Sequence, residues 1–317
     1  MAKTNEEIIR SLEARAENEH TRRNYVSKLS NLSEKLGKTI YEILRSPKTS
    51  IVQIKGLYPE DSTRKTIVTS ILAGFKYGNI GLSKAQEGWR SIHEELREKE
   101  LSNYKKNEPT ERQKENYLSF EEIREKYKEL ASGDPHATKK SSLEYLLLSI
   151  TLNLRPKRAD YGDVMVIGPK HKVPEKGNYM FIDKATNSYL ELRQFKTAKT
   201  YDSVKEDLPE ELYKDVKDSM RRHPRSRLFT DRSNMPYTSS AYGTYVIRCY
   251  ERLFGKSVGV TMLRHIYVRE KLDFNMMTQE ELDEEARLMT HSPELQRLYR
   301  WVLRDNEREK CECVEKN

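Results

Sequence analysis

Residues 289–301 read MTHSPELQRLYRW and place a tyrosine, Tyr299, eight positions after a histidine, His291. Apolar side chains recur around them at near-helical spacing: Leu288, Leu295, Leu298 and Val302. This spacing predicts one helix together with its leading turn. A single tyrosine on such a helix is usually a packing residue, so a chemical role for Tyr299 needs support from the rest of the chain.

The whole chain is basic and hydrophilic. It has 317 residues, with 58 Lys and Arg against 50 Asp and Glu, a net charge of +8 and a mean hydropathy of −0.89. Hydrophobic residues still make up 36%, enough for the cores of two domains of ordinary size. The positive surplus favours a polyanionic partner, although many basic proteins bind no nucleic acid.

Several classes of protein are not expected from this sequence. No apolar run approaches the roughly 20 residues of a membrane helix, and the first 20 residues are too acidic for a targeting peptide. Three cysteines, two of them in the terminal Cys311–Cys313 segment, support neither a disulfide framework nor a zinc site. We therefore expect an intracellular protein with no membrane association.

Helical periodicity dominates residues 1–101. Apolar residues repeat at three- and four-residue spacing in Thr21–Leu36, in a segment that Ser62 can cap and that ends near Gly78, and again in Ala85–Leu96. These segments predict a small helical bundle. Residues 102–116 contain Pro109 and almost no apolar side chains, which predicts a solvated linker.

Residues 117–317 are predicted to form a second domain. Ser119 and Glu122 have the spacing of a capping box, and the apolar segment Leu143–Leu154 predicts a buried helix. Three segments then have strand character: VMVI at 164–167, YMFI at 179–182 and YLELRQF at 189–195. Helical periodicity returns after Pro209. The expected fold class is mainly α with a small antiparallel β-sheet.

Cationic residues occur in an informative order along this second domain. The segment LRPKR puts Arg155 and Arg158 at the end of the buried helix, and KTAKT puts Lys196 and Lys199 on a hairpin turn. Further on, TMLRHIYVRE supplies Arg264 and His265, ahead of His291 and Tyr299. Each feature alone is more often a helix end, a solvated turn or a salt-bridge partner. The order of all of them is much less expected by chance.

Together these residue types suit phosphoryl transfer without a metal. Two arginines can bind the non-bridging oxygens of a phosphodiester under attack, and a histidine can donate a further hydrogen bond. Cations of this kind make a tyrosine usable as a nucleophile, because they stabilise the developing phenolate. A lysine on a hairpin can protonate the departing 5′ oxygen. The acidic segment QEELDEEAR at 279–287 is predicted to be a solvated helix face instead of a metal site.

In this order, the segments resemble those of the tyrosine recombinases, the lambda-integrase-like family of DNA breaking-rejoining enzymes. The first domain resembles their core-binding domain, and the second resembles their catalytic domain. The resemblance points to five catalytic residues: Arg155 in TLNLR, Lys196 in QFKTAKTYDSVKEDLP, Arg264 in LRHIYV, and His291 with Tyr299 in MTHSPELQRLY. Where these motif segments depart from the common family pattern, they are similar to those of recombinases from large eukaryotic DNA viruses and mobile elements.

This resemblance implies a site-specific recombinase or integrase that acts on double-stranded DNA through a 3′-phosphotyrosyl intermediate. It also implies self-association as a tetramer on DNA and a reaction that needs no cofactor and no metal. Such enzymes often donate a C-terminal segment to a neighbour, which residues 301–317 suggest only weakly.

Three positions depart from the family pattern. Thr261 stands where a histidine usually precedes the second arginine, and a threonine cannot act as an acid or base near neutrality; His265 is the residue that could compensate. Pro156 follows Arg155 and the usual glutamate is missing, so Arg158 is a rival for the first arginine. Thr290 replaces the common glycine before His291.

Other basic residues are candidate DNA contacts. In the first domain, where a clamp over the far side of a duplex is expected, they are Arg22, Arg23, Lys28, Arg64, Lys65 and Lys76. In the second, the segment RRHPRSRLF contributes Arg221, Arg222 and Arg225, although a solvated loop explains this segment equally well.

Two alternative functions stay open at this point. A type IB topoisomerase uses a closely similar set of residues. The second alternative is a DNA-binding accessory protein that keeps the fold but has impaired catalysis. Thr261 is the residue that favours this alternative.

Overall fold

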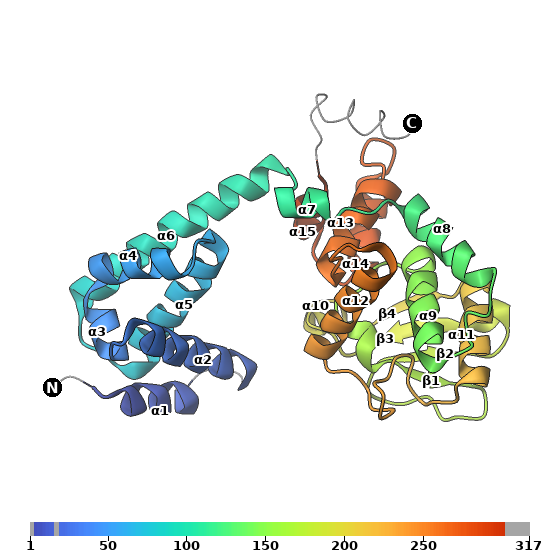
Figure 1. Ribbon diagram of the computed structural model, residues 1–317, viewed down its shortest axis with the longest axis horizontal. Helices are drawn as coiled ribbons and strands as arrows, with labels where there is room; N and C mark the ends of the chain where they lie inside the picture. Colours follow the sequence, from blue (N-terminus) through green and yellow to red (C-terminus); the bar gives the residue numbers. More distant parts are fainter. Residues whose placement is uncertain (1–2, 16–18, 302–317) are drawn as a thin grey trace. The chain divides into compact units, whose positions relative to one another are not determined.

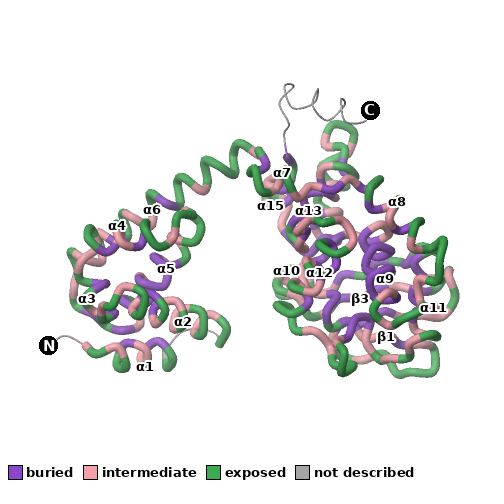
Figure 2. Tube along the Cα trace, in the orientation of Figure 1, coloured by how far each residue is buried: buried purple, intermediate pink, exposed green. Residues whose placement is uncertain are grey.

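The computed structural model describes residues 3–15 and 19–301, and within them the chain divides into two units between Lys106 and Asn107. Each unit contains its own buried core (Figure 2). No helix in these described ranges is both long enough and apolar enough to cross a membrane.

In residues 3–15 and 19–106, the first unit contains helices and no strand, as predicted (Figure 1). They are α1 Asn5–Arg15, α2 Glu19–Leu36, α3 Ile40–Arg45, α4 Pro47–Leu57, α5 Asp61–Gly78 and α6 Ser83–Lys106. Trp89 lies fully buried at the centre of this unit, and its indole nitrogen donates a hydrogen bond of 2.9 Å to the carbonyl of Leu44.

Two local predictions for this region are wrong. Glu60, rather than Ser62, precedes the first residue of α5. Helix α6 continues to Lys106, so residues 102–106 are helical and the predicted linker begins too early. The polar residues at the end of α6 have sufficient helix propensity to continue the helix in water. The absence of an apolar stripe at 102–106 therefore did not indicate the end of the helix.

The second unit begins with three capped helices, α7 Glu111–Glu115, α8 Phe120–Ala131 and α9 Lys139–Asn153. The capping box of Ser119 and Glu122 is confirmed at the start of α8. Helix α9 is buried along most of its length, as its apolar sequence predicts, and packs against α8 and against α11. The chain leaves α9 in an extended conformation at Leu154 and passes through the short 3-10 turn Asp160–Asp163.

The sheet has four strands in the order β1 Met165–Ile167, β2 Tyr179–Phe181, β3 Tyr189–Leu192 and β4 Val204–Asp207. Strands β2, β3 and β4 are antiparallel, but β1 and β2 are parallel, so the predicted antiparallel sheet is in fact mixed. The long connection 168–178 carries the chain back past β1, so that Met165 pairs with Tyr179 and both strands start at the same end.

The remaining helices are α10 Ala198–Tyr201, α11 Glu210–Arg222, α12 Ser239–Phe254, α13 Val260–Lys271, α14 Gln279–Leu288 and α15 Pro293–Tyr299. Mainly α with a small β-sheet is therefore the correct fold class. The predicted helix around residues 289–301 is α15, which starts after Ser292 caps it and ends at Tyr299.

Candidate active site

Tyr299 and Arg264 come together in the core of the second unit. The phenol oxygen of Tyr299 lies 3.5 Å from Nη1 of Arg264, and both side chains are buried. Nη2 of Arg264 donates to the carbonyl of Met289 at 2.8 Å, whereas its Nε is buried and has no hydrogen-bond partner within the described residues. Burial lowers the pKa of Arg264, because the charged form has lost its water.

His291 lies beside the same tyrosine and is completely buried. Its ring centre is 5.2 Å from that of Tyr299. Burial first, and then repulsion from Arg264, lower the pKa of His291 to about 3, so the imidazole is neutral at physiological pH in the free protein.

Gln296, a residue that the sequence did not single out, orients this histidine. Its side-chain nitrogen donates to the carbonyl of Leu282 at 3.1 Å, which turns the amide oxygen toward Nε2 of His291 at 3.2 Å. In that orientation Nε2 carries the proton and donates it, and Nδ1 is left as an acceptor. Nδ1 is buried and unpartnered in the described part of the chain.

Thr290 adopts a left-handed backbone conformation, with φ of 59°. That conformation explains why a glycine is the usual residue in the resembling motif, because a β-branched side chain is strained there. The Thr290 hydroxyl accepts a hydrogen bond of 3.4 Å from Nη2 of Arg264, which offsets part of the strain. The turn aims His291 at the tyrosine.

The connection between β3 and β4 is attached to this same turn. Thr197 donates its hydroxyl to the carbonyl of Thr290 at 3.0 Å, and Tyr201 donates its hydroxyl to the carbonyl of His291 at 3.0 Å. The neighbouring Lys196 and Lys199 are exposed and form no ion pair or hydrogen bond with the residues described. The predicted hairpin turn is longer than expected: β3 ends at Leu192 and the connection contains α10.

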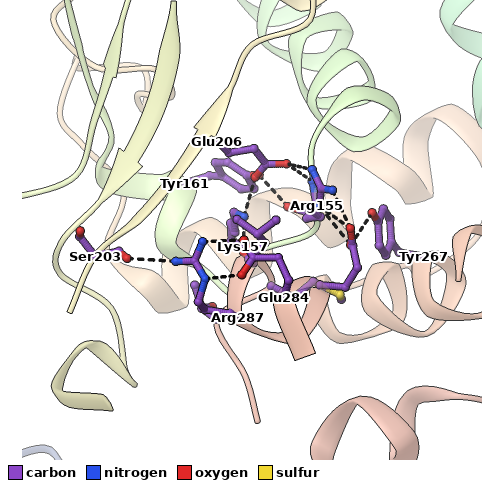
Figure 3. A network of polar contacts seen from close by, with 12 residues as sticks. Arg155, Lys157, Tyr161, Ser203, Glu206, Tyr267, Glu284 and Arg287 are labelled. Carbon is purple, nitrogen blue, oxygen red and sulfur yellow. Dashed lines mark hydrogen bonds and ion pairs between the residues drawn. The ribbon is translucent and has the colours of Figure 1, made fainter. Parts of the chain in front are cut away.

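Arg155, predicted as the first catalytic arginine, is bound to carboxylates instead (Figure 3). Its Nη1 lies 3.0 Å from Glu206 and its Nη2 2.6 Å from Glu285, while Tyr267 donates to the same Glu285 at 3.0 Å. Hydrogen bonds to Glu285 raise the pKa of Arg155. Both terminal nitrogens of its guanidinium are therefore occupied by carboxylates of the protein.

Buried Lys157 completes this ionic cluster. Its Nζ lies 2.7 Å from Glu206 and also bonds to the carbonyl of Leu288. Burial alone would raise the pKa of Glu206, but Lys157 and then Arg155 outweigh it and lower the pKa. The prediction that residues 279–287 form only a solvated face is wrong for Glu285, which this cluster half-buries.

Arg158, three residues after Arg155, carries a charge that acts on the candidate site. It is close enough to lower the pKa of His291 and of Arg264 through charge repulsion. Its guanidinium makes no ion pair or side-chain hydrogen bond with other described residues, whereas that of Arg155 is saturated. The geometry therefore favours Arg158 over Arg155 as the first arginine of the site.

A half-buried acid, Asp160, lies close enough to Arg264 and Arg158 for their charges to act on it. Burial raises its pKa, and the two arginines partly oppose that shift. One carboxylate oxygen, Oδ2, is buried with no hydrogen-bond partner among the described groups. Its place two residues after Arg158 is visible in the sequence, but its interaction with Arg264, 104 positions further along the chain, depends on the fold.

His265 lies behind Tyr299 and does not line the site. Its ring stacks on Trp301 with centres 4.4 Å apart, meets Tyr299 edge-on at 4.8 Å, and its Nδ1 is 3.1 Å from the carbonyl of Tyr299. Burial lowers the pKa of His265 to about 4. A neutral imidazole that contacts the tyrosine backbone can position Tyr299, but it does not reach the position of Thr261 on the exposed side of α13.

Thr261 is exposed in the first turn of α13. Its hydroxyl makes no hydrogen bond within the described ranges. It is therefore accessible to a ligand, but no described group fixes its orientation.

The basic residues predicted to contact DNA from the first unit mostly bind groups of that unit. Arg64 is largely buried and donates to the carbonyls of Tyr58 and Pro59, so it is structural. The others are placed as follows: Arg22 donates to the carbonyl of Glu13, Arg23 pairs with Glu19, Lys65 pairs with Glu100, Lys76 lies over the ring of Tyr77, and Lys28 has no polar contact in the described residues.

The second basic cluster divides into exposed and structural residues. Arg221 and Arg222 are exposed and pair with Asp218 and Asp134. Arg225 donates to the carbonyls of Ser219, His223 and Leu228, and burial lowers its pKa to about 10. Its guanidinium holds its own loop together, which favours a structural role, and its contact with DNA stays a prediction.

Within the described residues, no group of three or more His, Cys, Asp or Glu side chains could hold a metal ion. Cys249 is a free, buried thiol, and Cys311 and Cys313 lie outside the described residues, as does the predicted exchange of the C-terminal segment.

No family model matches this sequence, and no curated protein matches it. Among solved structures, the XerA recombinase is similar over 99% of this chain and 98% of its own, with 12% sequence identity and a TM-score of 0.43. A likeness that distant has no bearing on activity, so any function must follow from the geometry of the site.

Proposed function

We propose that this chain cleaves and rejoins double-stranded DNA through a covalent bond between Tyr299 and a 3′ phosphate, as a site-specific recombinase or integrase. The observation that supports the proposal most is the position of the Tyr299 phenol oxygen, 3.5 Å from a buried arginine. Around it, Nε of Arg264 and Nδ1 of His291 are buried without partners in the described part of the chain.

Unpartnered buried polar groups cost free energy, commonly about 1–3 kcal/mol each, and binding of a ligand that completes them removes that cost. A phosphodiester fits these groups. Its non-bridging oxygens accept hydrogen bonds from Arg264 and Arg158. Its negative charge favours the protonated form of His291 that results when Nδ1 takes up a proton during the reaction.

In the proposed reaction, the phenol oxygen of Tyr299 attacks phosphorus and the bond from phosphorus to the 5′ oxygen breaks. The phenol loses its proton, for which Nδ1 of His291 is the nearby buried acceptor. Lys196 gives a proton to the 5′ oxygen, from a loop that Thr197 attaches to the turn before His291. Attack by a 5′ hydroxyl on the phosphotyrosine reverses these steps and rejoins the strand.

The proposal needs neither a metal nor a nucleotide, and the protein would act wherever its DNA is in the cell. Assembly as a tetramer on DNA belongs to the proposal too. A type IB topoisomerase would use the same side chains, and it would relax supercoiled DNA as a monomer without forming junctions.

The test uses a nicked duplex that traps the cleaved state, incubated with the protein in EDTA and analysed on a denaturing gel. We expect a covalent protein–DNA band that Tyr299→Phe abolishes while DNA binding is nearly unchanged. Target sites are first selected from random-sequence DNA, so that a missing site does not cause a negative result. Tight binding of selected sites without any adduct would overturn the proposal.

One observation favours the second candidate, a DNA-binding accessory protein with impaired catalysis. Thr261 occupies the position of an expected histidine and contacts no described group. The negative outcome of the same gel, with binding retained, supports this function.

A further inference from the structure

A second cavity lies at the other end of α9 from Arg158. It has a volume of about 690 Å³ and is bordered by the first residues of α9, the segment 230–237 and one face of α12. Helix α9 has 15 residues and so spans about 22 Å. The cavity is therefore separate from the site around Tyr299 and has no part in the reaction proposed there.

Positive side chains predominate around this cavity. Five cationic residues and two acidic ones line it, a surplus of three positive charges. Lys139 donates to the carbonyl of Asp231 at 2.6 Å, and Arg252 pairs with Glu144. The other three cations, Lys140, Arg232 and Arg248, are exposed and have no ion pair or hydrogen bond within the described chain. The free charges suit an anion.

The same cavity has an aromatic wall. The rings of Tyr237 and Tyr245 stack with centres 5.2 Å apart and an interplanar angle of 20°, and Phe229 supports Tyr245 from a distance of 5.8 Å. Tyr237 is half-buried, and Leu143 adds apolar surface. A wall of fixed aromatic rings beside free arginines suits a planar ring that carries phosphate, since bases stack on aromatic faces and phosphates pair with guanidinium groups.

Two residues that line the cavity, Thr230 and Tyr245, carry hydroxyl groups without a partner in the described chain. Thr230 is only 2% exposed, and both its Oγ1 and the hydroxyl of Tyr245 are buried without a hydrogen bond in the described ranges. Both residues line the cavity. A ligand edge that carries donors and acceptors would remove the cost of leaving them unsatisfied.

We propose that this cavity binds a single nucleotide, with its base against Tyr237 and its phosphates on Lys140, Arg232 and Arg248. The volume is in the range of small-molecule sites, about 300–1,000 Å³, and is too small for a duplex. A free nucleoside triphosphate and the terminal nucleotide of a DNA strand share this chemistry, and experiment distinguishes them.

Calorimetric titration of the full-length protein with ATP, GTP, adenosine and inorganic pyrophosphate tests the proposal. We expect a triphosphate to bind more tightly than adenosine or pyrophosphate, and the double variant Arg232→Ala, Arg248→Ala to weaken binding about tenfold or more. Tyr237→Ala should remove the advantage of ATP over pyrophosphate. The matched control is Arg124→Ala, which removes a surface arginine of α8 that faces Glu121 at 4.0 Å.

Equal binding of pyrophosphate and ATP, or binding that the double variant leaves unchanged, would overturn the proposal. So would the absence of binding at about 1 mM nucleotide, the weak end of specific affinities. Competition with a short single-stranded oligonucleotide identifies the source: displacement of ATP indicates a strand terminus, and no displacement indicates a free nucleotide. The Tyr299→Phe protein should bind ATP normally, so failure of DNA cleavage does not affect this test.

Discussion

Two buried polar clusters lie close together in the second unit, and they differ in whether their groups are satisfied. In the cluster of Arg155, Glu206 and Glu285, each charge has a partner of opposite sign. Around Tyr299, by contrast, Arg264 and His291 each keep a buried nitrogen without a partner among the described groups. A complete set of partners is typical of a structural cluster, whereas open donors and acceptors indicate a place for a ligand.

After the loss of the nucleophile in Tyr299→Phe, the largest effect expected on the chemistry comes from Arg158. Arg158→Ala should reduce the rate of adduct formation by about 10²–10³, the usual loss when one donor to a developing negative charge is removed. Its stability should barely change, because the side chain makes no ion pair in the described chain. Single-turnover cleavage and thermal unfolding measure the two quantities separately.

Arg155→Ala should have the opposite profile. Removing it leaves buried Glu206 with Lys157 alone and half-buried Glu285 with no cation among the described residues, which should lower the free energy of unfolding by about 3 kcal/mol, the low end for a broken buried ion pair. Cleavage per folded molecule should fall much less than for Arg158→Ala. A stably folded but inactive Arg155→Ala protein, beside an active Arg158→Ala protein, would reverse the assignment of the two arginines.

Acid should destabilise the protein partly through the cluster around Tyr299. The pKa of His291 is about 3 and that of His265 about 4 in the folded state, below the roughly 6.5 of an unfolded histidine. Their contribution to stability is therefore complete above about pH 6.5 and is lost as pH falls toward 4 and then 3, by at most about 1.4 kcal/mol per pH unit for each.

Denaturant unfolding between pH 4 and pH 7 measures how the free energy of unfolding depends on pH. This range covers most of the interval between the folded-state pKa values of the two histidines and their unfolded value. His265→Phe should flatten the slope, and the exposed His20→Asn serves as the control. Identical slopes for wild type and His265→Phe would contradict the burial argument.

Gln296→Leu should have a smaller effect on cleavage. It removes the acceptor that orients His291 and leaves the imidazole free to change tautomer, so we expect about a tenfold loss of rate, comparable to loss of other outer-shell partners of a histidine. Gln296→Glu keeps the acceptor, and its charge should shift the pH dependence of cleavage upward. If Gln296→Leu cleaved DNA at the wild-type rate, the tautomer of His291 would not affect the reaction.

The smallest effect is expected from Thr290→Gly. Glycine relieves a left-handed strain of about 1–2 kcal/mol, but it loses a hydrogen bond to Arg264 and gains flexibility in the unfolded state. We expect a net stabilisation below about 1 kcal/mol, measured by chemical denaturation. Thr290→Ala, which keeps the strain and loses the hydrogen bond, should be less stable than either.

The sequence by itself determined the local features of this protein. The repeat of apolar residues placed the long helices, and the Ser119–Glu122 spacing located the start of α8, because helix periods and caps involve residues three or four apart. The pairing of Arg264 with Tyr299 was also predictable, from the two segments LRHIYV and MTHSPELQRLY.

Only the tertiary structure decided the rest. Whether Arg155 or Arg158 keeps a free guanidinium depends on how the chain turns after Leu154 and on Glu285, 130 residues away from Arg155. The parallel pairing of β1 with β2 and the cavity beside Tyr237 likewise depend on segments far apart in the chain. No periodicity records such contacts, since the free energy of an ion pair or a strand pair depends on which surfaces the fold brings together.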